Sequence, residues 1–486
     1  MLSDKFKLKV NDKPLKLHEA RVSAYPFNRV WPGYQRSIEQ TETAWFASCD
    51  FDNTATFEIE VMGEPVKTVE LRPFEFGIDY TVAGNKILFT LSEPRHFTVE
   101  VNGCHRALHI FTQRPLTYIR KENDLYFGPG EHYPGIIIPK SGQTVYIDEN
   151  AVVYGAIFIN HASDVKITGR GILDSSHLKR GEEATPSQPG GELAAKLYEL
   201  GFSNKDMRYS GSLVAIGAKN LIVEGIIFRD SMFWTIITRN GCRDVLIDNI
   251  KIIGQWRYNS DGIDICCGEN ISVRNCFIRT FDDCLVVRGA YLEGEDGMKV
   301  ANVLVEDCVM WCDWGKSLEI WTGDKPARIE NVAFVNNYLI HLASIAIDIT
   351  TYYGSSNTYV GNIHYENIFI DSDTNCLLPS IQRSDDQEYQ CNNRNFQPEL
   401  IRIECGKLGK NTGNQGILSA TDHSEFHLTY ANIIFNNIRV NDKLNRQLAI
   451  VIDNHEKPLK IANIILHDVR SDNLAVAQEV SNFSIN

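Results

Sequence analysis

A repeat in the sequence limits which folds this chain can adopt. An asparagine or aspartate recurs at the start of short runs of β-branched residues and leucine. These residues are Asp164, Asn220, Asp244, Asn270, Asn302, Asn331, Asn362, Asn432 and Asn463. Subtracting successive numbers gives intervals of 56, 24, 26, 32, 29, 31, 70 and 31 residues. A period of roughly 20 to 50 residues is the signature of a solenoid, in which each repeat packs on its neighbours.

The residue type at these positions indicates which solenoid forms. Asparagine tolerates the left-handed backbone conformation and hydrogen-bonds to local backbone, so it suits a sharp corner. A second asparagine or aspartate often follows five residues later, as in Asn270 and Asn275 or Asn302 and Asp307. The apolar runs lack helical periodicity, which disfavours a leucine-rich repeat, and the period is short for a propeller blade. The sequence therefore predicts a parallel β-helix with about one coil per repeat.

Residues 1–115 follow a different pattern. Apolar and polar residues alternate over 57–61, 87–91 and 97–101, and turn signals separate these runs. This spacing is typical of a small antiparallel β-sandwich. We therefore predict an all-β chain with an N-terminal β-sandwich domain over 1–115 and a β-helix domain over 116–486. The aromatic residues between 25 and 34 are assigned to core or inter-domain packing, with part of a sugar-binding platform as the alternative.

The two long intervals of the repeat contain polar insertions. These cover about residues 175–209, with a possible short helix at 192–200, and about 371–429. Insertions in a solenoid form loops on its flank, frequently on the binding face. We expect both insertions to wall the same groove.

Charge and composition exclude some partners. The formal net charge is -14 and no basic run is present, which argues against a nucleic-acid partner. No stretch has the length of a membrane span, and residues 1–7 lack the apolar core of a signal peptide. We expect a cytoplasmic protein, unless a leader has been removed. Several cysteines lie in apolar strand patterns and are predicted to be reduced and buried: Cys242, Cys266, Cys276, Cys284 and Cys308.

Four carboxylates fall in a short window of the repeat region. Asp261 and Asp264 lie in one repeat, and Asp282 and Asp283 lie in the next. Asp261 and Asp282 are 21 residues apart, slightly less than one coil, and strands of neighbouring coils lie about 4.8 Å apart. We therefore expect these carboxylates to stack on one face, where at least one pKa is raised. A protonated carboxyl beside an ionised one has the groups needed to cleave an acetal.

The motif pair Asn259–Asp264 and Asp282–Val286 resembles the signature of the polygalacturonases, glycoside hydrolase family 28, and of the related dextranase and isopullulanase family 49. The resemblance covers about residues 126–371 and implies a right-handed parallel β-helix that hydrolyses glycosidic bonds with inversion. It also implies that Asp282 is the general acid and that Asp261 and Asp283 hold and deprotonate the water. The N-terminal sandwich is similar to the layout of the dextranase family.

Two segments depart from the polygalacturonase pattern. The Gly-His-Gly of that family is replaced by the segment Trp314–Trp321, and the Arg-Ile-Lys that grips a substrate carboxylate is replaced by Ala346–Thr351. Losing this cationic clamp and gaining Asp348 argues against a galacturonate there. We therefore favour a neutral α-linked glucan, with a pectic oligosaccharide as the alternative, since Arg279, Arg288 and Lys316 are available to bind an acidic sugar.

Several further residues are candidates for substrate contact. They are Lys316, Glu319, Arg288, Trp256, Trp314, Trp321, Asn259 and Tyr352. As an alternative to substrate contact, Lys316 and Glu319 form an ion pair on the coil surface. Asp264 is expected to cap a turn or to pair with Arg279 or Arg288. Five of the seven tryptophans lie near the motif, and we expect two or three of Trp234, Trp256, Trp311, Trp314 and Trp321 to line the groove. The expected partner is an oligo- or polysaccharide, with no metal and no cofactor.

Two other functions remain open for a β-helix. A polysaccharide lyase or uronate epimerase uses a basic residue and commonly Ca²⁺, which clustered aspartates bind through oxygen. A non-catalytic glycan-binding protein or adhesin is the other.

Overall fold

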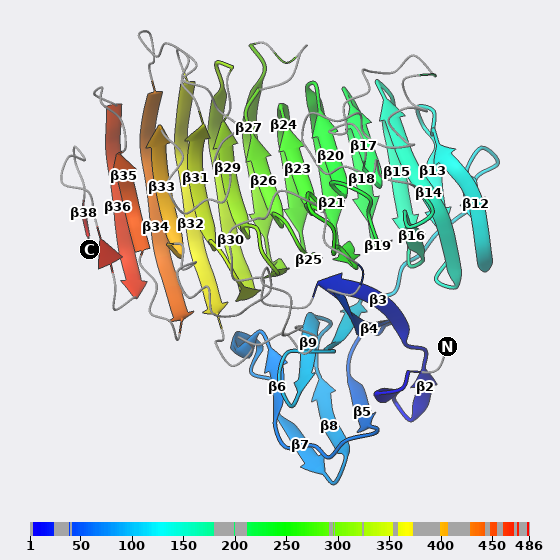
Figure 1. The fold of residues 1–486 in the computed structure, drawn as a ribbon. Helices are drawn as coiled ribbons and strands as arrows, with labels where there is room; N and C mark the ends of the chain where they lie inside the picture. Colours follow the sequence, from blue (N-terminus) through cyan, green and yellow to red (C-terminus); the bar gives the residue numbers. More distant parts are fainter. Residues whose placement is uncertain are drawn as a thin grey trace.

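The computed structural model describes residues 3–23, 38, 41–178, 199, 211–290, 295, 297–322, 325–352, 358–372, 399–406, 428–442, 448–453, 460–470, 474–475 and 484–485. Within these residues the chain forms a small β-sandwich and a long stack of parallel strands (Figure 1). The predicted fold, a parallel β-helix preceded by an N-terminal β-sandwich, is confirmed.

The sandwich consists of two five-stranded sheets, with strand orders β2-β1-β5-β8-β7 and β3-β4-β10-β9-β6. Its strands are β1 (Phe6–Val10), β2 (Lys13–Leu15), β3 (His18–Ser23), β4 (Thr41–Asp50), β5 (Ala55–Val61), β6 (Val69–Arg72), β7 (Tyr80–Ala83), β8 (Lys86–Leu91), β9 (His96–Val101) and β10 (Leu108–Gln113), with a 3-10 helix η2 (Phe74–Phe76). The alternating pattern of β5 buries Phe57 and Ile59 between the sheets, and Phe57 stacks on Phe89 with ring centroids 5.0 Å apart.

The β-helix strands pair in parallel with the coil before and the coil after, which creates three faces along the axis. The site face contains β17 (Leu213–Ile216), β20 (Ile236–Arg239), β23 (Ile263–Cys266), β26 (Leu285–Arg288), β29 (Leu318–Thr322), β31 (Ile347–Tyr352), β33 (Ile401–Gly406), β35 (Leu448–Asp453) and β37 (Leu474–Ala475). The second face contains β11 (Leu125–Phe127), β13 (Thr144–Ile147), β15 (Ser163–Gly169), β18 (Lys219–Glu224), β21 (Cys242–Asp248), β24 (Gly268–Arg274), β27 (Lys299–Glu306) and β38 (Ser484–Ile485).

The third face contains the first part of β12 (Gly130–Ile137), whose residues from Gly135 on continue onto the site face, and β16 (Ile172–Asp174), β19 (Ile227–Arg229), β22 (Lys251–Ile253), β25 (Phe277–Thr280) and β28 (Val309–Cys312). Long strands pass from one face to the next: β14 (Ala151–Asn160), β30 (Arg328–Leu342), β32 (Thr358–Ser372), β34 (Leu428–Asp442) and β36 (Lys460–Arg470). Inside the coils, apolar side chains such as Ile263, Leu285, Leu318 and Ile347 stack in register and are fully buried.

The corners of the coils show why asparagine recurs. Eight of the nine repeat residues, from Asp164 to Asn432, have φ between 51° and 58°. Their side chains form a ladder from coil to coil, in which Asn302 donates to Asn270 at 3.0 Å and Asn331 donates to Asn302 at 3.1 Å. The predicted left-handed corners are therefore confirmed, and each asparagine both adopts the strained conformation and joins adjacent coils.

The sandwich packs against the third face (Figure 1). Phe46 and Phe111 of the sandwich share one buried cluster with Phe277 and Trp311 of the β-helix. Phe111 and Phe277 lie with ring centroids 5.0 Å apart. The last sandwich strand ends at Gln113 and the first β-helix strand begins at Leu125, while the division into domains 1–115 and 116–486 stays a prediction.

Some expectations concern residues outside the described ranges. Most of both insertions and the aromatic residues between 25 and 34 lie there, so their predicted roles stay predictions. The five cysteines predicted to be reduced are free and buried, as expected, whereas Cys104 is disulfide-bonded. Among the residues described, no helix has the length and apolar character needed to cross a membrane.

Candidate active site

The predicted acid cluster lies at one edge of the site face. Asp261 comes two residues before β23, Asp283 comes two residues before β26, and Asp282 comes three residues before β26. The strands pair with Ile263 opposite Leu285, an offset of 22 residues. Asp261 is therefore level with Asp283 rather than with Asp282, which corrects the pairing expected from coil length. The two segments are joined where the Gly262 N–H donates to the Asp283 carbonyl oxygen at 2.8 Å.

Glycines let the chain pass close beneath the cluster. A Cβ added at Gly262 would lie 2.3 Å from the carbonyl oxygen of Cys284 in the next coil. A Cβ added at Gly315 would lie 2.5 Å from the backbone nitrogen of Asp283 and 2.7 Å from its Oδ1 atom. Any side chain at these positions would push the coils apart. Both glycines therefore allow the carboxylates of neighbouring coils to lie one strand spacing apart.

Asp282 has the properties of a proton donor. Its side chain is nearly buried, with the whole residue 6% exposed, and its Oδ2 atom accepts a hydrogen bond of 3.1 Å from the Asn259 N–H. Burial, reinforced by the neighbouring charge of Asp283, raises the pKa of Asp282 to about 7. Removal from water disfavours the charged form, so this carboxyl carries a proton in a large fraction of molecules at neutral pH.

Asp283 is held in the opposite state although it is the next residue. Its Oδ1 atom accepts a hydrogen bond of 2.8 Å from the Lys316 N–H, and the Lys316 Nζ atom lies 3.5 Å from the same oxygen. Burial alone would raise its pKa. The charge of Lys316, the neighbouring Glu319 side chain, the charge of Arg288 and the hydrogen bond from the Lys316 backbone together outweigh burial and hold the pKa of Asp283 below its usual value. Asp283 is therefore the ionised carboxylate of the cluster.

Arg288 joins the remaining carboxylates. Its Nε atom donates to Asp264 Oδ1 at 2.6 Å, and its Nη2 atom donates to Asp261 Oδ2 at 3.0 Å and lies 3.7 Å from Asp283 Oδ2. The predicted pairing of Asp264 with Arg288 is thus confirmed. Burial raises the pKa of Asp264 to about 6. Burial also raises the pKa of Asp261 well above its usual range, and repulsion from the neighbouring carboxylates raises it further. The Oδ1 atom of Asp261 has no hydrogen-bond partner among the described residues.

Lys316 and Glu319 form an ion pair, with Lys316 Nζ 3.0 Å from Glu319 Oε1. It is not the surface pair considered from the sequence, because Glu319 is fully buried. Burial, and then repulsion from Asp283, raise the pKa of Glu319 well above its usual range. Glu319 and Lys316 therefore belong to the same electrostatic unit as Asp283.

Two tryptophan rings flank Arg288, and Trp314 and Trp256 contact other residues. The Arg288 guanidinium lies 4.5 Å from the ring centroid of Trp234 and 5.3 Å from that of Trp321. Trp314 stacks on Phe281 with ring centroids 5.5 Å apart. Trp256 is half-buried, and its Nε1 atom donates to Asp230 at 3.2 Å.

Two residues considered for the groove lie elsewhere. Trp311 is on β28 of the third face, buried against the sandwich. Arg279, on β25 of the same face, covers the Trp311 ring at 3.8 Å and contacts His109 at 3.1 Å. The expectation that Arg279 binds an acidic sugar in the groove is therefore wrong, and of the two partners considered for Asp264 it is Arg288 that pairs with it. Tyr352 is the last residue of β31, but its side chain lies outside the described part of the structure. Asn259 contacts the acid cluster through its backbone N–H, which donates to Asp282.

One feature of the site was not found from the sequence. Asp348 follows Glu319 in the outward-facing row of the site face, and Arg402 comes next. Arg402 donates to Asp348 through Nε at 3.0 Å and through Nη2 at 2.7 Å, and both residues are buried. The outward-facing row therefore does contain a cation, Arg402, which lies 54 residues after Asp348 in the sequence. Within the described ranges, no three His, Cys, Asp or Glu side chains are grouped so as to hold a metal ion.

Comparisons with known proteins connect this geometry to carbohydrate enzymes. Residues 200–397, which include the acid cluster, Lys316, Glu319 and Asp348, match the profile of Glycosyl hydrolases family 28. The chain is 23% identical over 300 residues to a dextranase of Arthrobacter sp. (strain CB-8), covering 57% of this chain and 44% of the relative. It is 26% identical over 195 residues to an exopolygalacturonase of Cochliobolus carbonum, covering 32% and 43%.

The chain thus spans less than half the length of these curated relatives. The solved structure titled "Dex49A from Penicillium minioluteum" aligns with a TM-score of 0.62 at 14% identity, over 100% of this chain and 93% of that one. That likeness extends through the sandwich and the β-helix and concerns the fold. The resemblance stated from the motif is confirmed: this chain is a parallel β-helix protein similar to the glycosyl hydrolases of family 28 and to the dextranases.

Proposed function

We propose that this chain is an inverting glycoside hydrolase that cleaves an α-glycosidic bond in an oligo- or polysaccharide. The observation that carries the proposal is the opposite perturbation of two adjacent carboxyls. The pKa of Asp282 is raised to about 7, whereas that of Asp283 is lowered. Glycoside hydrolysis by inversion requires one protonated and one ionised carboxyl at the same bond.

In the proposed reaction, Asp282 gives its proton to the glycosidic oxygen while the bond from the anomeric carbon to that oxygen breaks. Water attacks the anomeric carbon from the opposite face, and its proton goes to Asp283. Lys316 and Arg288 hold Asp283 ionised before the reaction. Asp261 contributes the unpartnered Oδ1 atom, which is available to hold the water.

The favoured substrate is a neutral α-linked glucan. The segment similar to a dextranase covers 57% of this chain, against 32% for the exopolygalacturonase. Arg402, the cation of the outward-facing row, is bound at two positions by Asp348, so the pair carries no net charge with which to grip a substrate carboxylate.

A pectic oligosaccharide is the second candidate. Arg288 and Lys316 lie at the acid cluster and are both cationic, and residues 200–397 match the family 28 profile. Both cations already contact carboxylates of the protein, which is why we place this substrate second.

The test is product analysis with a panel of α-glucan and pectic oligosaccharides, using the wild type and Asp282→Asn. We expect wild type to release reducing ends, and Asp282→Asn to lose several orders of magnitude in turnover while still binding substrate. Asp174→Asn is a matched control, because Asp174 is also buried but pairs with Arg229 on the third face. Near-normal turnover by Asp282→Asn would refute the assignment.

The same assay separates the competing functions. A lyase forms an unsaturated product that absorbs in the ultraviolet and loses activity with a chelator, whereas a hydrolase forms reducing ends without either effect. A non-catalytic glycan-binding protein releases no product, and Asp282→Asn leaves its binding unchanged. The stereochemistry of the first product, followed by NMR, decides between inversion and retention.

A further inference from the structure

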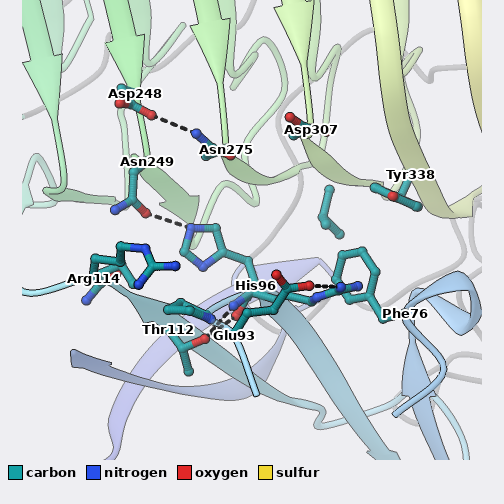
Figure 2. Close-up of a pocket in the computed structure, with 14 residues that line it drawn as sticks. Phe76, Glu93, His96, Thr112, Arg114, Asp248, Asn249, Asn275, Asp307 and Tyr338 are labelled. Carbon is teal, nitrogen blue, oxygen red and sulfur yellow. Dashed lines mark hydrogen bonds and ion pairs between the residues drawn. The ribbon is translucent and has the colours of Figure 1, made fainter. Parts of the chain in front are cut away.

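A cleft of about 550 Å³ lies between the sandwich and the corner where the second and third faces of the β-helix meet (Figure 2). In Figure 2 the β-helix contributes one wall and the sandwich contributes the other. The residues used below are Asn275, Asp307 and Tyr338 from the β-helix, and Phe76, Glu93 and His96 from the sandwich. The lining contains no member of the acid cluster, so the cleft is separate from the proposed catalytic site.

A second ladder of side chains, five residues after the first in each coil, runs along this corner, and it is interrupted at the cleft. Elsewhere along the corner, Asn367 donates to Asn336 and Asn437 donates to Asn367, each at 2.8 Å. Asn275 donates to Asp248 at 3.1 Å, but the next coil places Asp307 where an amide donor stands in later coils. A carboxylate has no N–H to give to the Asn275 oxygen. Two acceptors therefore face the cleft at successive coils.

The end of the cleft is aromatic. Tyr338 is half-buried and meets Phe76 edge to face, with ring centroids 4.8 Å apart. Tyr338 also stacks on Phe369 at 5.1 Å, which fixes its ring. The Arg95 guanidinium covers the Phe76 ring at 4.7 Å. A rigid ring beside planar polar groups suits the C–H faces and hydroxyls of a sugar.

The charges of the lining nearly balance. Glu93, Asp248 and Asp307 are acidic, whereas Arg95 and Arg114 are basic. Burial lowers the pKa of His96 well below its usual value, so this imidazole is neutral, and its Nε2 atom lies 2.8 Å from Asn249 Oδ1. A site with this balance does not select a polyanion.

We propose that this cleft is a second, non-catalytic binding site for a short neutral oligosaccharide. Its volume lies within the range of about 300–1,000 Å³ of small-ligand sites. Its polar lining favours a ligand rich in hydroxyls, which donate to Asn275 and Asp307 while a ring face packs on Tyr338. The inference rests on the proposed function only for the choice of glycan. Such a site would hold a polymer to the protein away from the cleavage point and add avidity.

The test uses Asp282→Asn to prevent turnover and calorimetric titration with isomaltotriose, maltotriose and trigalacturonate. A second change, Asp307→Asn, supplies the missing amide donor to Asn275 and suits the left-handed backbone at φ 53°. The matched control is Asp244→Asn, because Asp244 is an exposed aspartate with φ 57° at the other corner ladder. Tyr338→Ala removes the ring as an independent change.

We expect two binding events per chain for a neutral trisaccharide. Asp307→Asn and Tyr338→Ala each weaken one of them at least tenfold, while Asp244→Asn changes neither and Asp307→Asn keeps its thermal stability. The proposal is overturned if no neutral trisaccharide gives a second event, if trigalacturonate is preferred there, or if both cleft variants bind like the control. Hydrolysis by the wild type without a second event leaves the proposed function standing. Cleft binding without any hydrolysis refutes the proposed function alone.

Discussion

Replacing Asp282 by asparagine should stabilise the protein at neutral and alkaline pH while it abolishes turnover. The pKa of Asp282 rises from an ordinary 3.8 to about 7 on folding. Between these values the folded chain keeps a proton that the unfolded chain has released, so the free energy of unfolding falls as pH rises. A difference of about 3 pH units, at about 1.36 kcal/mol for each, amounts to about 4 kcal/mol above pH 7. Asparagine resembles the protonated carboxyl and avoids this destabilisation.

The assay is urea unfolding of wild type and Asp282→Asn at pH 4.5, 6, 7 and 8. The stability difference should be small at pH 4.5, grow through the interval and level off near pH 8, with the variant more stable by up to about 4 kcal/mol. Asp174→Asn gives the opposite sign, because it removes the partner of Arg229. A difference that is independent of pH, or a variant less stable than wild type at pH 8, would refute the assignment of a buried protonated carboxyl at Asp282.

Three further predictions concern the same face. The turnover number should fall as pH rises through about 7, because Asp282 then loses the proton it donates; an initial-rate profile that stays flat from pH 7 to 9 contradicts this. Lys316→Met should raise the pKa of Asp283 and move the acidic limb of the profile to higher pH, with about tenfold less turnover at pH 5 and a milder loss in Lys316→Arg. Arg402→Met should cost about 3–5 kcal/mol in urea unfolding because it leaves Asp348 buried and unpaired, and adding Asp348→Leu should recover most of this loss; no recovery would show that the pair is not the cause.

Local backbone requirements made the fold predictable from the sequence. A left-handed corner is costly for most residues, so the recurrence of Asn270, Asn302 and Asn331 marks each coil wherever it lies in space. The alternation within β5 likewise specifies one buried face in the sandwich. These signals depend only on neighbours in the chain, and the structure follows them.

The composition of the acid cluster was predictable for a related reason. Residues separated by about one coil must lie on adjacent strands, which brings Asp261 beside Asp283. The offset of 22 residues, one more than assumed, depends on the corner geometry of this coil. The spacing indicated that one carboxyl of the cluster would keep a proton, and only the family resemblance indicated that this is Asp282. The repeat could not show which one, because the protonation states depend on the positions of Lys316 and Arg288 relative to two carboxyls that are adjacent in sequence.

Local conformational preference and the period of the repeat were enough to predict the coiled architecture, the sandwich and the gathering of the aspartates. The face that a side chain occupies, in contrast, depends on how the coils turn and on where the sandwich packs. Arg279 and Trp311 lie near the motif in sequence but point into the junction with the sandwich. Arg402 lies far from Asp348 in sequence but is paired with it. Alternation within a strand distinguishes inside from outside, and it does not distinguish one outer face from another or identify what covers it.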